Sequence, residues 1–133
     1  ARAATMARGG RSRGPPKILI LARRNDIMTC SVRYAEDLGF KADGVLDNAS
    51  AKNMLEKEEY AAACFGTYFK NCEMFKEDVK EMKALLDQKG IIWGEQPFFG
   101  DVKAVMLELG LLEADTTNKK TGTRLVQQPM IAG

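Results

Sequence analysis

The sequence has no histidine, and its three cysteines are scattered. Histidine is the commonest general acid–base in enzymes, and zinc is usually held by closely spaced Cys and His ligands. The absence of histidine therefore excludes catalytic triads that use an imidazole base and argues against a zinc site. An odd number of scattered cysteines, at Cys30, Cys64 and Cys72, is typical of a reducing compartment, where cysteines act as small buried hydrophobic residues.

Long apolar runs are also missing. No run approaches the roughly 20 residues that a membrane-spanning helix needs, so we expect no integral membrane span. The fractions of apolar residues, 45%, and of charged residues, 29%, are typical of a globular domain. A length of 133 residues favours a single domain.

Acidic residues are absent from both ends of the chain. The first 17 residues contain Arg2, Arg8, Arg11, Arg13 and Lys17, and residues 116–133 contain Lys119, Lys120 and Arg124. Because the whole chain carries a net charge of only +2, the middle must be acidic. We interpret 1–16 as a basic extended arm, 17–114 as the folded domain and 115–133 as an extended C-terminal tail. Arginine-rich, acid-poor arms are typical of organelle transit peptides, and they also bind RNA or acidic protein surfaces.

Strand and helix patterns alternate between the two arms. Strands are predicted at 18–21, 42–46, 60–65 and 91–94, and helices at 27–38, 51–59, 71–89 and 100–109. Within 115–133 we expect a short extended piece at 124–126. Alternation with short connections predicts an α/β fold, a three-layer sandwich in which helices cover both faces of a four-stranded parallel sheet. The strand order that we expect is 2-1-3-4.

This pattern resembles the flavodoxin-like and Rossmann-like small α/β architecture, including receiver domains. The resemblance implies a ligand crevice beyond the carboxyl ends of strands one and three. Strand one is followed by Arg23, Arg24 and Asn25, and strand three by Gly66 and Thr67. Two arginines beside a helix N-terminus favour phosphate or carboxylate. The alternative is that Asn25 or Asp26 caps the helix and the arginines are solvated.

The functional motifs of these families are absent. Receivers have an acidic pair after strand one and an aspartate after strand three, where this chain has Arg23-Arg24 and Phe65-Gly66. The Ser/Thr-rich phosphate loop of flavodoxins, the GxGxxG fingerprint and the P-loop are also missing. The sequence therefore predicts no bound cofactor and no catalytic constellation.

Several other residues allow two interpretations each. Asp43 and Asp47 flank a short strand and are expected to serve its turns. Cys64 lies in a buried strand and is expected to be inert, whereas Cys72 lies near a predicted helix N-terminus, which lowers a thiol pKa. The aromatic residues around Pro97 are candidates for a partner interface or for core packing; they are Trp93, Phe98 and Phe99.

The combined prediction is a non-enzymatic accessory subunit that docks by its arms onto a larger organellar complex. A photosynthetic or respiratory membrane complex, bound from the soluble side, is favoured, and the chloroplast stroma is favoured over the mitochondrial matrix. The candidate partner-binding residues are Arg8, Arg11, Arg13, Trp93, Phe98, Phe99, Lys119, Lys120 and Arg124. Nucleic acid, as in an organellar ribosome, is less favoured because the domain itself is acidic. The alternative is a binding module for a nucleotide or phosphorylated metabolite, and an enzyme ranks last.

Overall fold

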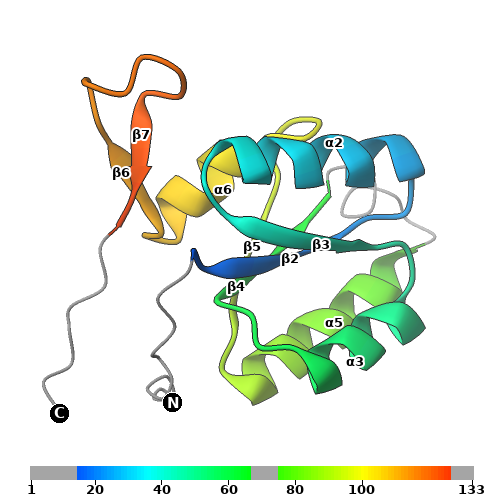
Figure 1. Cartoon of the computed structure of the whole chain (residues 1–133). Coiled ribbons are helices and arrows are strands. Elements are labelled where there is room, and N and C mark those ends of the chain that lie inside the picture. Colours follow the sequence, from blue (N-terminus) through cyan, green and yellow to red (C-terminus); the bar gives the residue numbers. More distant parts are fainter. Residues whose placement is uncertain (1–14, 67–74, 127–133) are drawn as a thin grey trace, which may run out of the picture.

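The computed structural model describes residues 15–66 and 75–126. Four parallel strands form the central sheet: β2 (Lys17–Leu21), β3 (Lys41–Val45), β4 (Ala62–Phe65) and β5 (Ile92–Glu95). Their order across the sheet is β3-β2-β4-β5 (Figure 1). This confirms the predicted order 2-1-3-4 and the α/β class, an architecture compatible with flavodoxin-like and Rossmann-like folds.

Helices cover both faces of the sheet, as predicted. On one face lie α2 (Asn25–Asp37) and α6 (Val102–Glu108), and on the other lie α3 (Asn48–Lys57) and α5 (Lys76–Lys89) (Figure 1). Two separate hydrophobic clusters result, one under each pair of helices. The predicted helix over 71–89 is observed from Lys76 onward, and its residues 71–74 lie outside the described part of the chain.

Strand β2 is the centre of both clusters. Its residues from Ile18 to Leu21 are all completely buried. Because successive side chains of a strand point to opposite faces, Ile18 and Ile20 pack under α2 and α6, whereas Leu19 and Leu21 pack under α3 and α5. Burial on both faces explains why this strand reads as a continuous aliphatic run.

Two glycines in the strands allow helices to approach the sheet closely. A Cβ atom at Gly44 would collide with the side chain of Met28 on α2. A Cβ atom at Gly94 would lie 2.7 Å from Val105 Cγ1 on α6. At helix ends, Gly39 and Gly90 have φ angles of 107° and 74°, as expected for residues that follow helix C-termini.

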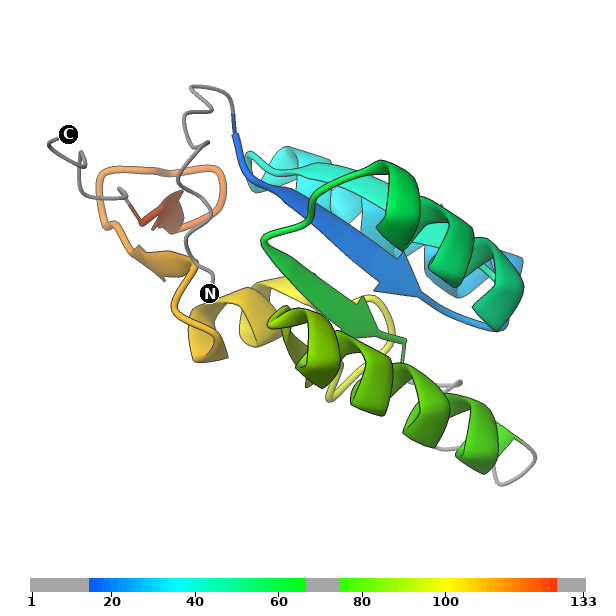
Figure 2. The same ribbon diagram turned by 90° about the horizontal axis from the view of Figure 1, so that it is seen from below.

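A β-hairpin spans the boundary between the predicted domain and the predicted tail. Strands β6 (Leu112–Ala114) and β7 (Thr123–Leu125) pair antiparallel in a second sheet (Figures 1 and 2). The hairpin is fixed to the domain by a hydrogen bond of 3.0 Å from Lys103 Nζ to Thr121 O and by packing of Leu125 close to Gly39. The sequence predicted the extended piece near Arg124 but not its partner strand, so the boundary predicted at residue 115 falls inside the hairpin.

Both ends of the described chain lie at the amino end of the sheet. Pro16 O accepts a hydrogen bond from Lys41 N, and Val126 N donates one to Leu111 O. The first residue of β2 and the last turn of α2 lie on the same side of the molecule in both views (Figures 1 and 2). Among the described residues, no helix is both long enough and apolar enough to cross a bilayer.

Candidate functional site

The turn after β2 brings Arg23 into a buried polar network. Its side chain is only 7% exposed. Nη1 donates to Leu46 O at 2.9 Å, and Nη2 donates to Asn48 Oδ1 at 2.6 Å and to Asp78 Oδ2 at 3.2 Å. The guanidinium also lies 5.5 Å from the centre of the Phe75 ring. We call this set the Arg23 latch; it connects the end of β2 to α3 and α5.

The latch continues between the two helices. Asn48 Nδ2 donates to Glu81 Oε1 at 2.7 Å, and Lys52 Nζ lies 2.7 Å from Glu81 Oε2. These hydrogen bonds, that of Lys52 first, lower the pKa of Glu81 below its usual value. These described polar residues at this end of the sheet therefore form hydrogen bonds and ion pairs with one another.

Arg24 behaves differently from its neighbour. It occupies the N-cap position of α2 without a side-chain cap, and its side chain is 51% exposed. Its hydrogen bonds to Asp26 hold the pKa of that carboxyl below its usual value. Asp26 Oδ1 also accepts from Ile27 N at 2.8 Å, so a carboxylate already lies at the amino end of the helix.

These contacts correct two expectations about the turn. Neither Asn25 nor Asp26 is the N-cap, because α2 begins at Asn25 and Arg24 precedes it. The arginines are not both solvated, since only Arg24 is exposed. The helix begins at Asn25, two residues before the predicted start at 27, and Asp26 accepts a backbone hydrogen bond within its first turn.

Gly66, after β4, lies against the same turn. Its N–H donates to Leu21 O at 2.7 Å, and a Cβ atom would lie 3.0 Å from Ile27 Cγ2. The fold therefore brings Gly66 beside the residues that follow β2, as the topology predicted. Thr67 lies outside the described residues. Binding of a ligand by Arg23, Arg24, Asn25 and Gly66 remains a prediction.

The loop after β5 is organised by a buried residue that the sequence analysis missed. Gln96 is completely buried. Its Nε2 donates to Ser31 Oγ at 2.8 Å and to Cys64 Sγ at 3.6 Å, and its Oε1 accepts from Gly100 N at 3.0 Å. Its backbone N–H donates to Phe65 O at 2.9 Å. A polar residue directly after a short strand gave no signal that distinguished it from an exposed turn residue.

The segment that Gln96 closes, residues 96–101, presents two aromatic side chains to solvent, and we call it the aromatic loop. Phe98 is 71% exposed and Phe99 is 53% exposed. Asp101 N donates to Phe98 O at 3.1 Å, and Asp101 caps α6 through a hydrogen bond of 3.1 Å from Ala104 N. Hydrogen bonds therefore hold both ends of the loop, whereas the two aromatic side chains at its tip are exposed.

Trp93 does not join these aromatic residues. Its ring packs edge-on against Phe65 with centroids 5.9 Å apart, and its Nε1 donates to Asp87 Oδ1 at 2.9 Å. Lys83 Nζ lies 4.8 Å from the ring centre. The aromatic cluster expected around Pro97 is therefore divided: Trp93 packs against the core and the two phenylalanines face solvent.

The exposed large hydrophobic residues of the described chain lie on three elements: Ile92 on β5, Phe98 and Phe99 on the aromatic loop, and Leu107 on α6. Strand β5 is the last in the sheet. Because Gln96 N faces β4 and successive residues alternate, the backbone groups of Trp93 and Glu95 face away from the sheet.

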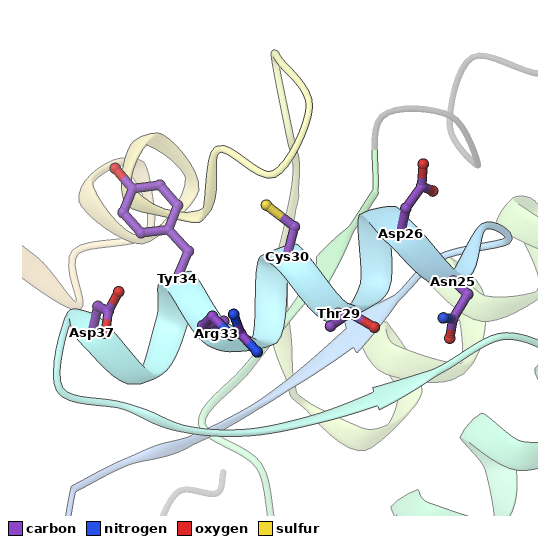
Figure 3. A pocket seen from close by; sticks show the side chains of 7 residues that line it. All are labelled: Asn25, Asp26, Thr29, Cys30, Arg33, Tyr34 and Asp37. Carbon is purple, nitrogen blue, oxygen red and sulfur yellow. The ribbon is translucent and has the colours of Figure 1, made fainter.

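A groove runs along α2 beside the aromatic loop (Figure 3). Its volume is about 550 Å³, and it is lined by Asn25, Asp26, Thr29, Cys30, Arg33, Tyr34 and Asp37. Cys30 and Tyr34 point toward the segment that precedes α6 (Figure 3). Burial, together with the charge of Asp101, raises the pKa of the Tyr34 phenol.

The remaining candidates have structural contacts or are exposed. Asp47 caps α3 by accepting from Ser50 N at 2.6 Å, and Asp43 accepts from Tyr60 Oη at 2.7 Å. Burial raises the pKa of Cys64 to about 12, which fits the expectation of an inert thiol. The hairpin carries the C-terminal basic residues: Lys119 and Lys120 are exposed, and Arg124 pairs with Glu113 at 2.6 Å.

Three of the predicted partner residues, Arg8, Arg11 and Arg13, and the thiol of Cys72 lie outside the described residues. Within residues 15–66 and 75–126, no cluster of three or more Cys, Asp or Glu side chains is arranged to hold a metal ion. Comparisons of the chain with protein-family models, with curated proteins and with solved structures found no match.

Proposed function

We propose that this protein is a non-enzymatic accessory subunit that docks onto a larger protein assembly. The observation that carries the proposal is the exposure of two adjacent aromatic side chains, Phe98 and Phe99, at the tip of the aromatic loop. Aromatic residues, phenylalanine included, are enriched at protein–protein interfaces.

The anchoring of the aromatic loop supports the same conclusion. Gln96 fixes the loop through its side chain and its backbone, and Gly100 is held by the Gln96 carboxamide. A loop that is ordered before binding loses less conformational entropy when the complex forms. The buried hydrogen bonds thus prepare two exposed side chains for docking.

The assembly that we propose is organellar, with a photosynthetic or respiratory membrane complex on its soluble side as the first choice. The basic N-terminal residues and the composition of the chain support this part of the proposal. In the chloroplast stroma or the mitochondrial matrix, the arms would add electrostatic attraction to an interface formed by the aromatic loop.

The test is to follow the full chain, tagged, in native gels of its own cells and to identify the co-migrating proteins by mass spectrometry. We expect the wild type to migrate in a large complex and Phe98→Ala/Phe99→Ala to be released from it. The matched control is Glu56→Ala/Glu59→Ala, which changes two exposed residues near the end of α3. A wild-type chain that migrates alone, or a double phenylalanine variant that stays in the complex, would contradict the proposal.

A small-ligand module is the second candidate. One observation favours it: the exposed Arg24 side chain lies at the amino end of α2, where no side chain caps the helix. Helix N-termini with a nearby arginine attract phosphate. A thermal-shift screen with nucleotides and sugar phosphates tests this candidate. Stabilisation that is lost in Arg24→Ala would favour the ligand module over a pure docking subunit, and no stabilisation would exclude these ligands.

A further inference from the structure

Strand β5 forms an open edge of the central sheet. It pairs with β4 on one side, and β6, the next strand in the chain, pairs with β7 in a separate sheet. Because Gln96 N donates to Phe65 O in β4 and backbone groups alternate along a strand, the N–H and C=O groups of Trp93 and Glu95 face outward. No described residue forms a backbone hydrogen bond with these outward groups. A further strand can therefore pair with this edge.

The edge is complementary to itself when a second copy runs antiparallel to it. In the register that places Trp93 opposite Glu95 of the copy, each outward N–H lies opposite a C=O. The two-fold axis then passes between Gly94 and its copy, and a residue without a side chain causes no steric conflict there. Ile92, whose side chain lies on the same face as Gly94, is 45% exposed and would be partly covered by the copy.

The residues on either side of this segment select the register. Ile91 N already donates to Leu86 O at 2.9 Å, and Pro97, which would lie opposite Ile91 of the copy, has no N–H to donate. A register with Trp93 opposite its own copy, or with Glu95 opposite its own copy, places a C=O of the other residue opposite one of these missing donors. The register with Trp93 opposite Glu95 therefore pairs the outward groups of both residues completely.

The charges beside the edge favour the same register. Lys83 on α5 lies 2.6 Å from the Glu95 carboxylate and 4.8 Å from the centre of the Trp93 ring. Side chains of directly opposite residues are neighbours in an antiparallel pair, so Lys83 beside Trp93 would lie near Glu95 of the copy. Asp87, the other charged group in a described contact with Trp93, accepts the indole N–H. The charges in contact with this edge are thus of both signs and do not repel a copy as a row of lysines would.

We propose that two copies of this chain associate through β5, so that their sheets join antiparallel into one continuous sheet. A contact of this kind is closed by its two-fold axis, and it therefore produces a dimer and not a growing chain of copies. The inference does not depend on the proposed docking function, because Phe98 and Phe99 lie beyond the paired segment.

Amide hydrogen exchange in the full wild-type chain tests this pairing directly. Exchange is measured by NMR at low and at near-millimolar protein concentration, and sedimentation equilibrium gives the mass, under reducing conditions that exclude disulfide-linked dimers. We expect a dimer at high concentration, with exchange of the Trp93 and Glu95 amides slowed several-fold. The internal control is β3, the other edge strand of the sheet. The amides of Ala42 and Gly44 face outward there, and their exchange should not depend on concentration.

Glu95→Pro is the variant that should break the dimer. Because the Glu95 N–H faces away from β4, proline removes an outward donor and leaves the hydrogen bonds to β4 in place. We expect this variant to be monomeric at every concentration. The matched control is Glu95→Ala, which loses the same carboxylate but keeps the N–H and should still form a dimer, with weaker affinity. Circular dichroism verifies that both variants are folded.

Three results would overturn the proposal. One is a wild-type chain that stays monomeric at near-millimolar concentration. Another is a dimer in which the Trp93 and Glu95 amides exchange as fast as in the monomer, because the contact would then lie elsewhere, for example at the aromatic loop. The third is slowed exchange at both edges of the sheet, which would mean open-ended addition of strands. The exchange measurement on the wild type decides between these outcomes even if Glu95→Pro fails to fold.

Discussion

Two loops at the carboxyl end of the sheet use similar polar residues for opposite purposes. After β2, Arg23 turns inward and its guanidinium is shared among a carbonyl, an amide and a carboxylate. After β5, Gln96 turns inward and thereby holds Phe98 and Phe99 in solvent. In the first loop the Arg23 guanidinium is already paired within the protein, and in the second two phenylalanine side chains are exposed. Of these two loops, the one after β5 therefore presents the larger exposed apolar surface.

The Gln96 loop should be the more sensitive of the two to mutation. Gln96→Ala removes a completely buried side chain and leaves Ser31 Oγ and Gly100 N without their partner. We expect a loss of about 3 kcal/mol in the free energy of unfolding, from unsatisfied polar groups and a cavity. Urea denaturation measures it, with the exposed Gln88→Ala on α5 as control. A loss no larger than that of the control would mean that the aromatic loop is not held by this residue.

Arg23 and Arg24 provide a matched pair in adjacent positions. Arg23→Ala leaves the acceptors Leu46 O and Asn48 Oδ1 unpaired inside the latch, and we expect it to cost about 2 kcal/mol. Arg24→Ala breaks an exposed pair with Asp26 and should cost less than about 0.5 kcal/mol. Arg23→Lys should fall between them, because lysine keeps the charge but not the planar fork. Equal unfolding midpoints for the two alanine variants would refute the latch.

The Cys64 thiol, which accepts a hydrogen bond from Gln96, makes the free energy of unfolding depend on pH. Burial raises the pKa of Cys64 from 9.0 to about 12. The unfolded chain loses this proton first, so the contribution of the thiol to stability is complete below pH 9 and decreases as the pH rises toward 12. Between pH 8 and pH 10 the loss should reach about 1.4 kcal/mol. Urea titrations at both pH values should show that the wild type loses about 1.4 kcal/mol more in the free energy of unfolding than Cys64→Ala does. Equal losses would show that the thiol is not shielded from water.

The smallest effect on stability is expected at the tip of the aromatic loop. Because Phe98 and Phe99 are largely exposed, Phe98→Ala/Phe99→Ala should change the free energy of unfolding by about 0.5 kcal/mol or less. Trp93→Ala should cost several times more, since its ring packs on Phe65 and its indole N–H bonds to Asp87. A large loss from the phenylalanine pair would mean that these side chains serve folding and not docking.

The sequence predicted the fold well because β2 is a continuous aliphatic run and α5 has a strong helical period. The uninterrupted burial of Ile18 to Leu21 could be read from composition alone. The hairpin could not, because strands of three residues such as β6 and β7 are too short to show a period. The roles of Arg23 and Gln96 were also beyond the sequence, since they depend on partners such as Asp78 and Ser31 that lie 55 and 65 residues away.

Because of the hairpin, the described chain begins and ends on the same side of the domain. Leu125 lies against Gly39, and Pro16 bonds to Lys41 two residues later in the chain, so the described chain begins and ends near the same turn. A partner that binds both ends would hold the domain bivalently, and the second contact would form at a high effective concentration. Loss of either contact would remove this gain in avidity. Binding through both ends would also leave the carboxyl end of the sheet pointing away from the surface to which the domain is attached.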